Sequence, residues 1–100
     1  MSHAIAMKDL FEPSEDIVAR EIEGEIIIIP LVAGIGDAED NLYTLNPTGR
    51  DVWQLMDGKN TVQDAVNILA ERYTASAVEI KKDVLGLLSE FLERRFVIKK

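Results

Sequence analysis

The side chains that most often perform acid–base or nucleophilic chemistry are scarce in this sequence. It contains one histidine, His3, close to the first residue, and no cysteine. A Ser/His/Asp arrangement needs a histidine held in a structured part of the chain, and a lone terminal histidine is usually incidental. The lack of cysteine excludes disulfides, thiolate metal sites and a cysteine nucleophile. We therefore expect no catalytic residue, and the chain is predicted not to be an enzyme.

An acidic, glycine-containing segment is the remaining candidate for metal or phosphate chemistry. Residues 33–40 read AGIGDAED and carry carboxylates at Asp37, Glu39 and Asp40. Their spacing differs from the D-x-[DN]-x-[DN]-G-x5-E pattern of a calcium loop, and solvated acidic loops are much commoner than cation sites. The two glycines give G-x-G without the third glycine and the following helix of a phosphate-binding turn. We expect a solvated loop with no metal and no other cofactor.

The overall charge of the chain bears on its partners. The 100 residues carry a net charge of −7, with 18 acidic and 11 basic side chains. Such a charge repels a phosphate backbone unless a separate basic face exists, so nucleic acid is disfavoured as a partner. Many of the basic residues lie in the last twenty or so positions, which permits an acidic partner at the C-terminal half.

The hydropathy pattern gives no sign of a membrane segment. The longest apolar run, residues 26–33, is interrupted by Pro30 and is far shorter than the roughly 20 residues that span a bilayer. The first residues lack the basic and apolar regions of a signal peptide. With 47% hydrophobic and 29% charged residues, the composition is that of one small globular domain. We expect a single cytosolic domain.

Extended segments should form the first half of this domain. Residues 16–22 and 25–31 are two runs rich in β-branched residues, joined at Glu23-Gly24 as in a hairpin. Four consecutive isoleucines at 26–29 predict a central strand with both faces covered. Residues 41–45 form the last extended segment before the helices and should be a sheet edge. Residues 1–15 show no clear period, so they are predicted to be a flexible tail preceding a domain at 16–100.

Capping signals predict three helices in the second half, which makes the fold class α+β: a three-stranded antiparallel sheet followed by three helices. The helices should cover about 47–57, from 62 onward, and 77–95. Gly58 supplies a left-handed stop for the first of them. The predicted N-caps are Asn46, Thr61 and Ser76.

The third predicted helix has an apolar arc wider than a core requires. One stripe, expected in the core, contains Ile80, Val84, Leu87, Leu88 and Phe91. A second flank, with Val78, Leu85 and Leu92 spaced by sevens, lies next to Lys81. Either the sheet also covers this flank, or the flank forms one wall of a groove.

The order of these features resembles a known family. The residues that carry the resemblance are LN-x-TG at 45–49, Asp57-Gly58, Thr61-Val62, Leu69 and the segment 83–92. In this order they look like the PqqD family, the small peptide-binding proteins of pyrroloquinoline quinone (PQQ) biosynthesis. Domains of this kind are also met as recognition elements for ribosomally made, modified peptides (RiPPs). The resemblance covers roughly residues 16–98.

The resemblance implies a winged-helix-like domain that acts as a peptide chaperone without catalytic activity. Such a domain captures the leader segment of a precursor peptide and presents it to a modifying enzyme, often a radical SAM protein, with the leader added as a strand beside the third strand and against the last helix. The exposed strand also permits a homodimer. Carried to this sequence, the peptide-binding residues are Asn41, Leu42, Tyr43, Thr44, Leu45, Val78, Lys81, Lys82, Leu85 and Leu92.

Two other functions fit the same elements. A winged-helix arrangement is shared with many transcription factors, because a fold does not fix a function. A recognition helix should present several basic or amide side chains near its start, and Lys81 with Lys82 is a thin supply. The other alternative is a general adaptor that binds a protein partner without a role in peptide modification.

Overall fold

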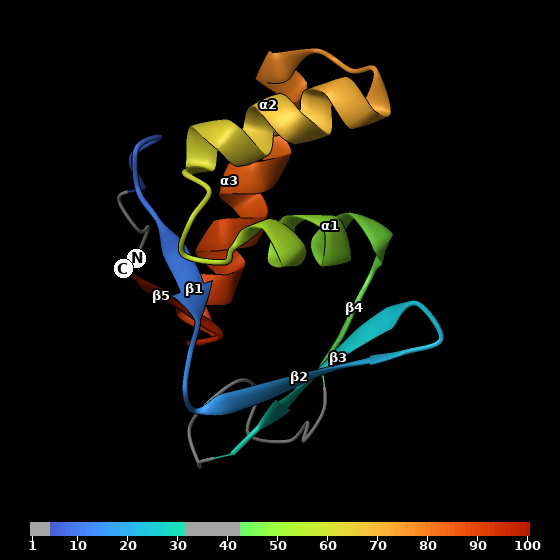
Figure 1. Cartoon of the computed structure of the whole chain (residues 1–100), viewed down its shortest axis with the longest axis vertical. Coiled ribbons are helices and arrows are strands. Elements are labelled where there is room, and N and C mark those ends of the chain that lie inside the picture. The colour runs from blue at the N-terminus through green and yellow to red at the C-terminus, as the bar shows by residue number, and fades with distance from the viewer. Residues whose placement is uncertain (1–4, 32–42) are drawn as a thin grey trace.

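The computed structural model describes residues 5–31 and 43–100, which form two antiparallel sheets and three helices (Figure 1). The elements in chain order are β1 (Phe11–Pro13), β2 (Ile17–Ile22), β3 (Glu25–Pro30), β4 (Tyr43–Leu45), α1 (Pro47–Leu55), α2 (Val62–Tyr73), α3 (Ala77–Glu93) and β5 (Val97–Lys99). The predicted α+β class, with a three-stranded antiparallel sheet ahead of three helices, is confirmed. The second sheet, made by β1 and β5, was not predicted.

The three-stranded sheet has the order β2-β3-β4, so the isoleucine-rich strand is central, as predicted. Glu23 and Gly24 form the connecting turn with positive φ angles of 52° and 82°, as a two-residue hairpin turn of the primed kind requires. Ile26 and Ile28 are buried, whereas Ile27 and Ile29 are half-buried. The prediction that both faces are covered is therefore only half right, because the helices lie on one side of this sheet (Figure 1).

The smaller sheet brings the first and last strands together. β1 pairs with β5 in antiparallel register, with Phe11 opposite Lys99. The Phe11 side chain is only 2% exposed, and the backbone carbonyl of Asp9 accepts a hydrogen bond from the Val62 amide at 3.1 Å. The expectation of a flexible tail over residues 1–15 is therefore corrected for Phe11–Pro13, which form part of the fold. A three-residue strand is too short to leave a readable period in the sequence.

All three predicted N-caps are present. The Asn46 side chain accepts a hydrogen bond from the Gly49 amide at 2.7 Å, and Thr61 forms a reciprocal capping box with Asp64. Ser76 accepts from the Glu79 amide at 3.2 Å. These bonds satisfy amides that have no partner within the first turn of a helix.

The ends of the first and third helices differ from the predicted ones. α1 ends at Leu55 because the Met56 amide bonds to the Trp53 carbonyl in a tighter turn; Gly58, at φ 77°, comes only after it. α3 ends at Glu93, and Arg95 takes the left-handed conformation at φ 62°. The Phe96 amide then bonds back to the carbonyl of Phe91 at 2.8 Å, which completes a Schellman motif with arginine where glycine is usual.

The core lies between the sheet and the helices. Trp53 of α1 stands edge-on to Phe91 of α3, with ring centroids 5.5 Å apart. Most of the predicted core stripe of α3 is buried, and Leu87 is half-buried at its margin. The buried part of that stripe consists of Ile80, Val84, Leu88 and Phe91.

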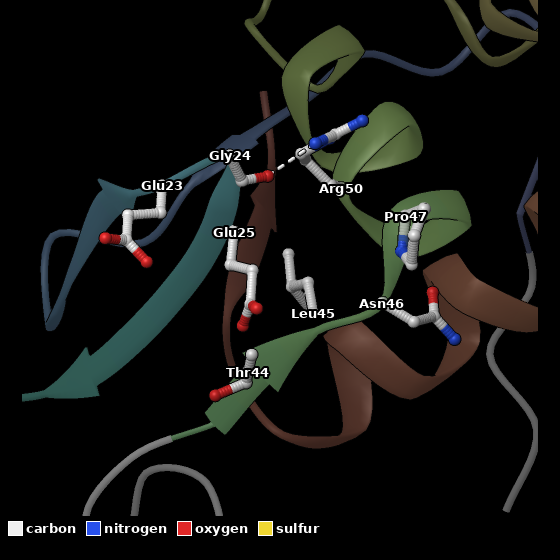
Figure 2. A pocket seen from close by; sticks show the side chains of 8 residues that line it. All are labelled: Glu23, Gly24, Glu25, Thr44, Leu45, Asn46, Pro47 and Arg50. Atoms are coloured by element: carbon white, nitrogen blue, oxygen red, sulfur yellow. Dashed lines mark hydrogen bonds between the residues drawn. The ribbon is translucent and has the colours of Figure 1, made fainter.

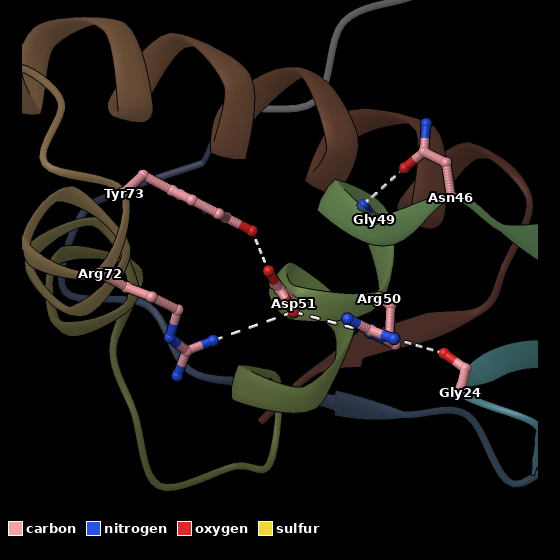
Figure 3. A network of polar contacts seen from close by, with 7 residues as sticks. All are labelled: Gly24, Asn46, Gly49, Arg50, Asp51, Arg72 and Tyr73. Atoms are coloured by element: carbon pink, nitrogen blue, oxygen red, sulfur yellow. Dashed lines mark hydrogen bonds and ion pairs between the residues drawn. The ribbon is translucent and has the colours of Figure 1, made fainter.

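A polar network fixes α1 to its neighbours (Figure 3). The Asp51 carboxylate accepts a hydrogen bond from the hydroxyl of Tyr73 at the end of α2 and lies 3.9 Å from Nη1 of Arg72. Arg50, one residue before Asp51, donates to the carbonyl of Gly24 in the hairpin turn. The network therefore joins the hairpin, α1 and α2, which together hold the junction between β4 and α1 in place.

Candidate functional site

Strand β4 is an edge of the larger sheet. It pairs with β3 alone, with Leu45 opposite Ile26 and Tyr43 opposite Ile28, so within residues 5–31 and 43–100 no strand pairs with its other edge. Leu45 is buried and Tyr43 half-buried, whereas Thr44 between them is exposed. Figure 2 shows β4 with the β2–β3 hairpin on one side and α3 on the other. An unpaired edge presents main-chain N–H and C=O groups that can bind another strand.

Two open hollows that share Gly86 lie next to each other on α3. The upper one, nearer the start of α3, adjoins the β4–α1 junction; it has a volume of about 470 Å³ and is lined by Asn46, Thr48, Lys82, Asp83, Gly86 and Leu87. The lower one, along the last turns of α3, is lined by α3 residues alone, which are Gly86, Ser89, Glu90, Glu93 and Arg94. We call the two hollows together the α3 groove, with an upper and a lower part.

Helical spacing explains which side chains meet there. Asp83, Leu87, Glu90 and Arg94 follow one another at intervals of four, three and four residues, so they share one face of α3, and Gly86 borders this face four residues before Glu90. Most of them are polar, and the half-buried leucine among them supplies an apolar contact next to the core.

Tyr43 connects β4 to α3 across the lower end of the groove. Its hydroxyl donates to Oε1 of Glu90 at 2.5 Å, and Nε of Arg94 lies 3.3 Å from the same oxygen. The Arg94 guanidinium is also 4.5 Å from the centre of the Tyr43 ring, and Phe96 packs edge-on against that ring. Burial, and then the hydrogen bond to the Glu90 carboxylate, raise the pKa of Tyr43 above its ordinary value, since both disfavour a charged phenolate.

A second depression lies on the hairpin side of β4 (Figure 2). It has a volume of about 510 Å³ between the Glu23–Glu25 turn and the start of α1. Its wall includes Thr44 and Arg50, and the Arg50 side chain is held by the Gly24 carbonyl. This depression lies next to the edge of β4 that pairs with β3, and not next to the other edge.

The structure brings together only part of the predicted site. Tyr43, Thr44 and Leu45 form β4, and Lys82 lines the α3 groove. Asn41 and Leu42 lie outside the described residues. The other predicted contacts, which are Val78, Lys81, Leu85 and Leu92, do not line the α3 groove.

Helix geometry separates Leu85 and Leu92 from the α3 groove. Residues two positions apart on a helix point about 200° apart, so Leu85 points away from the side of Leu87 and Leu92 away from that of Glu90. Leu85 and Leu92 are half-buried against the core, and Val78 is 80% exposed. That Val78, Lys81, Leu85 and Leu92 contact a peptide stays a prediction.

Sequence reasoning missed several residues of the α3 groove. It placed Leu87 in the core and passed over Gly86, Glu90 and Arg94, because it chose the flank of α3 by its apolar content. The signal that could have found them was the repeated spacing of three and four residues from Asp83 to Arg94.

Neither a metal-binding cluster nor a membrane-spanning helix is found in the described residues. No three His, Cys, Asp or Glu side chains gather there in a way that could hold a metal ion. His3 and the acidic segment 33–40 lie outside the described residues. None of the helices in residues 5–31 and 43–100 combines the length and apolar character needed to cross a bilayer.

The fold is similar to that of two solved structures. One is TbiB1 in complex with the TbiA(beta) leader peptide, at 16% identity and a TM-score of 0.73, covering 86% of this chain and 93% of that chain. The other is the PqqD truncation of Methylobacterium extorquens PqqCD, described as a functional, stand-alone RiPP recognition element. It matches at 23% identity and a TM-score of 0.71, covering 95% of each chain. At these identities the likeness concerns the fold.

Comparison at the level of sequence gives the family. No curated protein matches this chain. The sequence model of the family described as Coenzyme PQQ synthesis protein D (PqqD) matches residues 33–97, well over half of the chain. The chain belongs to the PqqD family.

Proposed function

We propose that this chain binds the leader segment of a ribosomally made precursor peptide and presents it to a modifying enzyme. The leader adds to the sheet as a strand along the unpaired edge of β4 and lies in the α3 groove. Main-chain hydrogen bonds to the edge supply affinity, and the groove selects side chains. The observation that carries the proposal is that the edge of β4 that pairs with no strand of the described residues belongs to a strand tied by Tyr43 to Glu90, which lines the α3 groove.

The family and the structural relatives support this function. PqqD membership gives the biosynthetic context, and TbiB1, of the same fold, is solved with a leader peptide. We infer that the domain itself is not catalytic and that the chemistry belongs to a separate modifying enzyme, for which a radical SAM protein is the expected partner. PQQ biosynthesis is one pathway in which such a domain would serve.

The charges on α3 favour a peptide over DNA. Lys81 and Lys82 are exposed near the start of the helix, but Glu79 and Asp83 flank them, and Glu90 and Glu93 follow. A helix that binds DNA next to the phosphate backbone needs an excess of basic side chains, and α3 lacks this excess.

Titration of ¹⁵N-labelled protein tests the proposal. The probes are synthetic peptides that copy the N-terminal halves of the short open reading frames neighbouring the gene for this chain, each with a scrambled control of identical composition. We expect one peptide to shift the amide signals of Tyr43, Thr44, Gly86 and Glu90, while its scrambled control leaves them in place. Equal shifts with the scrambled control, or shifts confined to α2, would contradict the proposed site.

A further inference from the structure

Gly86 lies in the middle of α3, where glycine is unfavourable. Glycine loses more backbone freedom than alanine when it enters a helix, so an interior glycine lowers helix stability. A glycine at such a position is usually explained in one of two ways: a neighbouring residue leaves no room for a side chain, or the backbone is left-handed. Neither applies within residues 5–31 and 43–100, because a Cβ built on Gly86 would meet none of their atoms within 4 Å and the residue is helical.

The other glycines in the described residues each have a reason within the fold. Gly24 and Gly58 have φ angles of 82° and 77°, which side chains rarely adopt. A Cβ on Gly49 would lie 3.1 Å from the Asn46 oxygen that caps α1. Among these four glycines, Gly86 is the one for which the described residues give neither a positive φ angle nor a close contact as a reason for glycine.

The place of Gly86 points to an outside molecule. It is exposed, it borders both parts of the α3 groove, and Leu87 beside it supplies the half-buried apolar wall. A strand added to the unpaired edge of β4 directs every second side chain to the face of Tyr43 and Leu45. That face is turned toward α3, as the bond from Tyr43 to Glu90 shows.

We propose that Gly86 is a specificity-determining residue, and that the space it leaves open receives one large apolar side chain of the bound peptide, such as leucine or phenylalanine. The side chain lies over Gly86 and contacts Leu87, while Lys82 and Asp83 border it at the rim. This inference rests on the proposed function, because it names the class of peptide that the groove accepts.

Changing the size of the side chain at position 86, and of the peptide residue that lies over it, tests the inference. Random twelve-residue peptides displayed on cells are sorted on the wild-type protein, and the enriched peptides are measured against the wild type, Gly86→Ala, Gly86→Leu and the control Gln63→Leu, which adds the same side chain at an exposed position of α2. We expect a large apolar residue at one shared position of the enriched peptides. Gly86→Leu should weaken their binding at least tenfold, Gly86→Ala less, and Gln63→Leu by less than twofold.

The same variants separate a binding role from a structural one. Gly86→Ala and Gly86→Leu should both raise the melting temperature by a few degrees, since each is a better helix former and a Cβ at this position meets no atom of the described residues within 4 Å. Replacing the shared large residue of the peptide by alanine should restore binding to Gly86→Leu. A more stable protein that binds more weakly is a result that a purely structural glycine would not give.

Two outcomes would overturn the inference, and they are distinguishable. Peptides that bind the wild type and Gly86→Leu equally well leave the proposed function in place and refute the role of Gly86. A wild-type protein that enriches no peptide refutes both proposals together.

Discussion

The hydroxyl of Tyr43 on β4 donates a hydrogen bond to the Glu90 carboxylate on α3 at 2.5 Å. The same carboxylate is paired with Arg94, whose guanidinium lies over the Tyr43 ring. This contact joins β4 to α3 through two side chains, Glu90 and Arg94, that line the lower part of the α3 groove. A residue of the sheet thus helps to hold in place the side chains of the surface next to it.

Removing this hydroxyl gives the first prediction. Tyr43→Phe should lower the free energy of unfolding by about 1 kcal/mol, the usual net contribution of one hydrogen bond. Because the folded protein has a raised Tyr43 pKa, the contribution of this phenol is fully present below pH 10 and is lost as the pH rises through the raised value. Urea unfolding between pH 8 and 11 measures this loss, and ultraviolet absorbance should show a late phenol titration that Tyr43→Phe abolishes and Tyr73→Phe retains.

The adjacent lysines Lys81 and Lys82 of α3 provide a test variant and its control for the role of charge in peptide binding. Lys82 lines the α3 groove, whereas Lys81 does not. Lys82→Ala should slow the association of an acidic leader peptide a few-fold at low salt, since a rim charge acts mainly on the association rate. Lys81→Ala should leave the rate unchanged. Stopped-flow measurements at low and high salt test the pair, and equal effects of the two variants would mean that the peptide lies over another flank of α3.

The left-handed residue after α3 predicts a stabilising substitution. Arg95 has φ 62°, a conformation that costs a side-chain-bearing residue about 1–2 kcal/mol but is free for glycine. Arg95→Gly should therefore raise the free energy of unfolding by about 1 kcal/mol. The control Lys81→Gly, within the same helix, should lower it by a similar amount. A destabilised Arg95→Gly would show that the arginine side chain makes a contact of greater value than the relief of strain.

Asp9 should make the domain sensitive to acid. The amide of Ala6 donates to its carboxylate at 2.8 Å, and Nζ of Lys99 lies 3.3 Å away. The hydrogen bond from Ala6 is the main cause of the lowered Asp9 pKa, and Lys99 adds to it. A lowered pKa contributes stability above the ordinary value of 3.8 that is lost as the pH falls through the lower, folded-state value.

The variant Asp9→Asn isolates this contribution. It should be less stable than the wild type at pH 7, and the difference should shrink as the pH falls below about 4, where the wild-type carboxyl takes up its proton. Urea midpoints at pH 7, 5 and 3 provide the measurement. A constant difference across this range would show that the charge of Asp9 does not matter.

Local signals predicted much of this fold. Asn46, Thr61 and Ser76 act within a single helical turn, so their sequence neighbours are enough to identify them as caps. The Glu23-Gly24 turn is equally local. The pairing of β1 with β5 depends on residues at opposite ends of the domain, and no short window of sequence contains both.

The groove was harder to predict than the fold. Apolar content favoured Leu85 and Leu92, whose side chains partly cover the core. The flank that faces β4 contains Gly86 and charged residues, and nothing in their composition distinguishes them from an ordinary solvated face. Which flank of α3 turns toward the sheet is set by the packing of Phe91 and Trp53, and that packing is known only from the structure.

The antiparallel pairing of β1 with β5 also has a consequence for the order of folding. During synthesis the first strand leaves the ribosome early, yet its partner is the last strand described, so Phe11 stays without its neighbouring strand until residues 97–99 emerge. Closing so long a loop carries an entropic cost that contacts between residues near in sequence avoid. Contacts between distant residues, such as this strand pairing, therefore slow folding. The hairpin and the helices can form in the nascent chain, but the second sheet forms only when synthesis has passed β5.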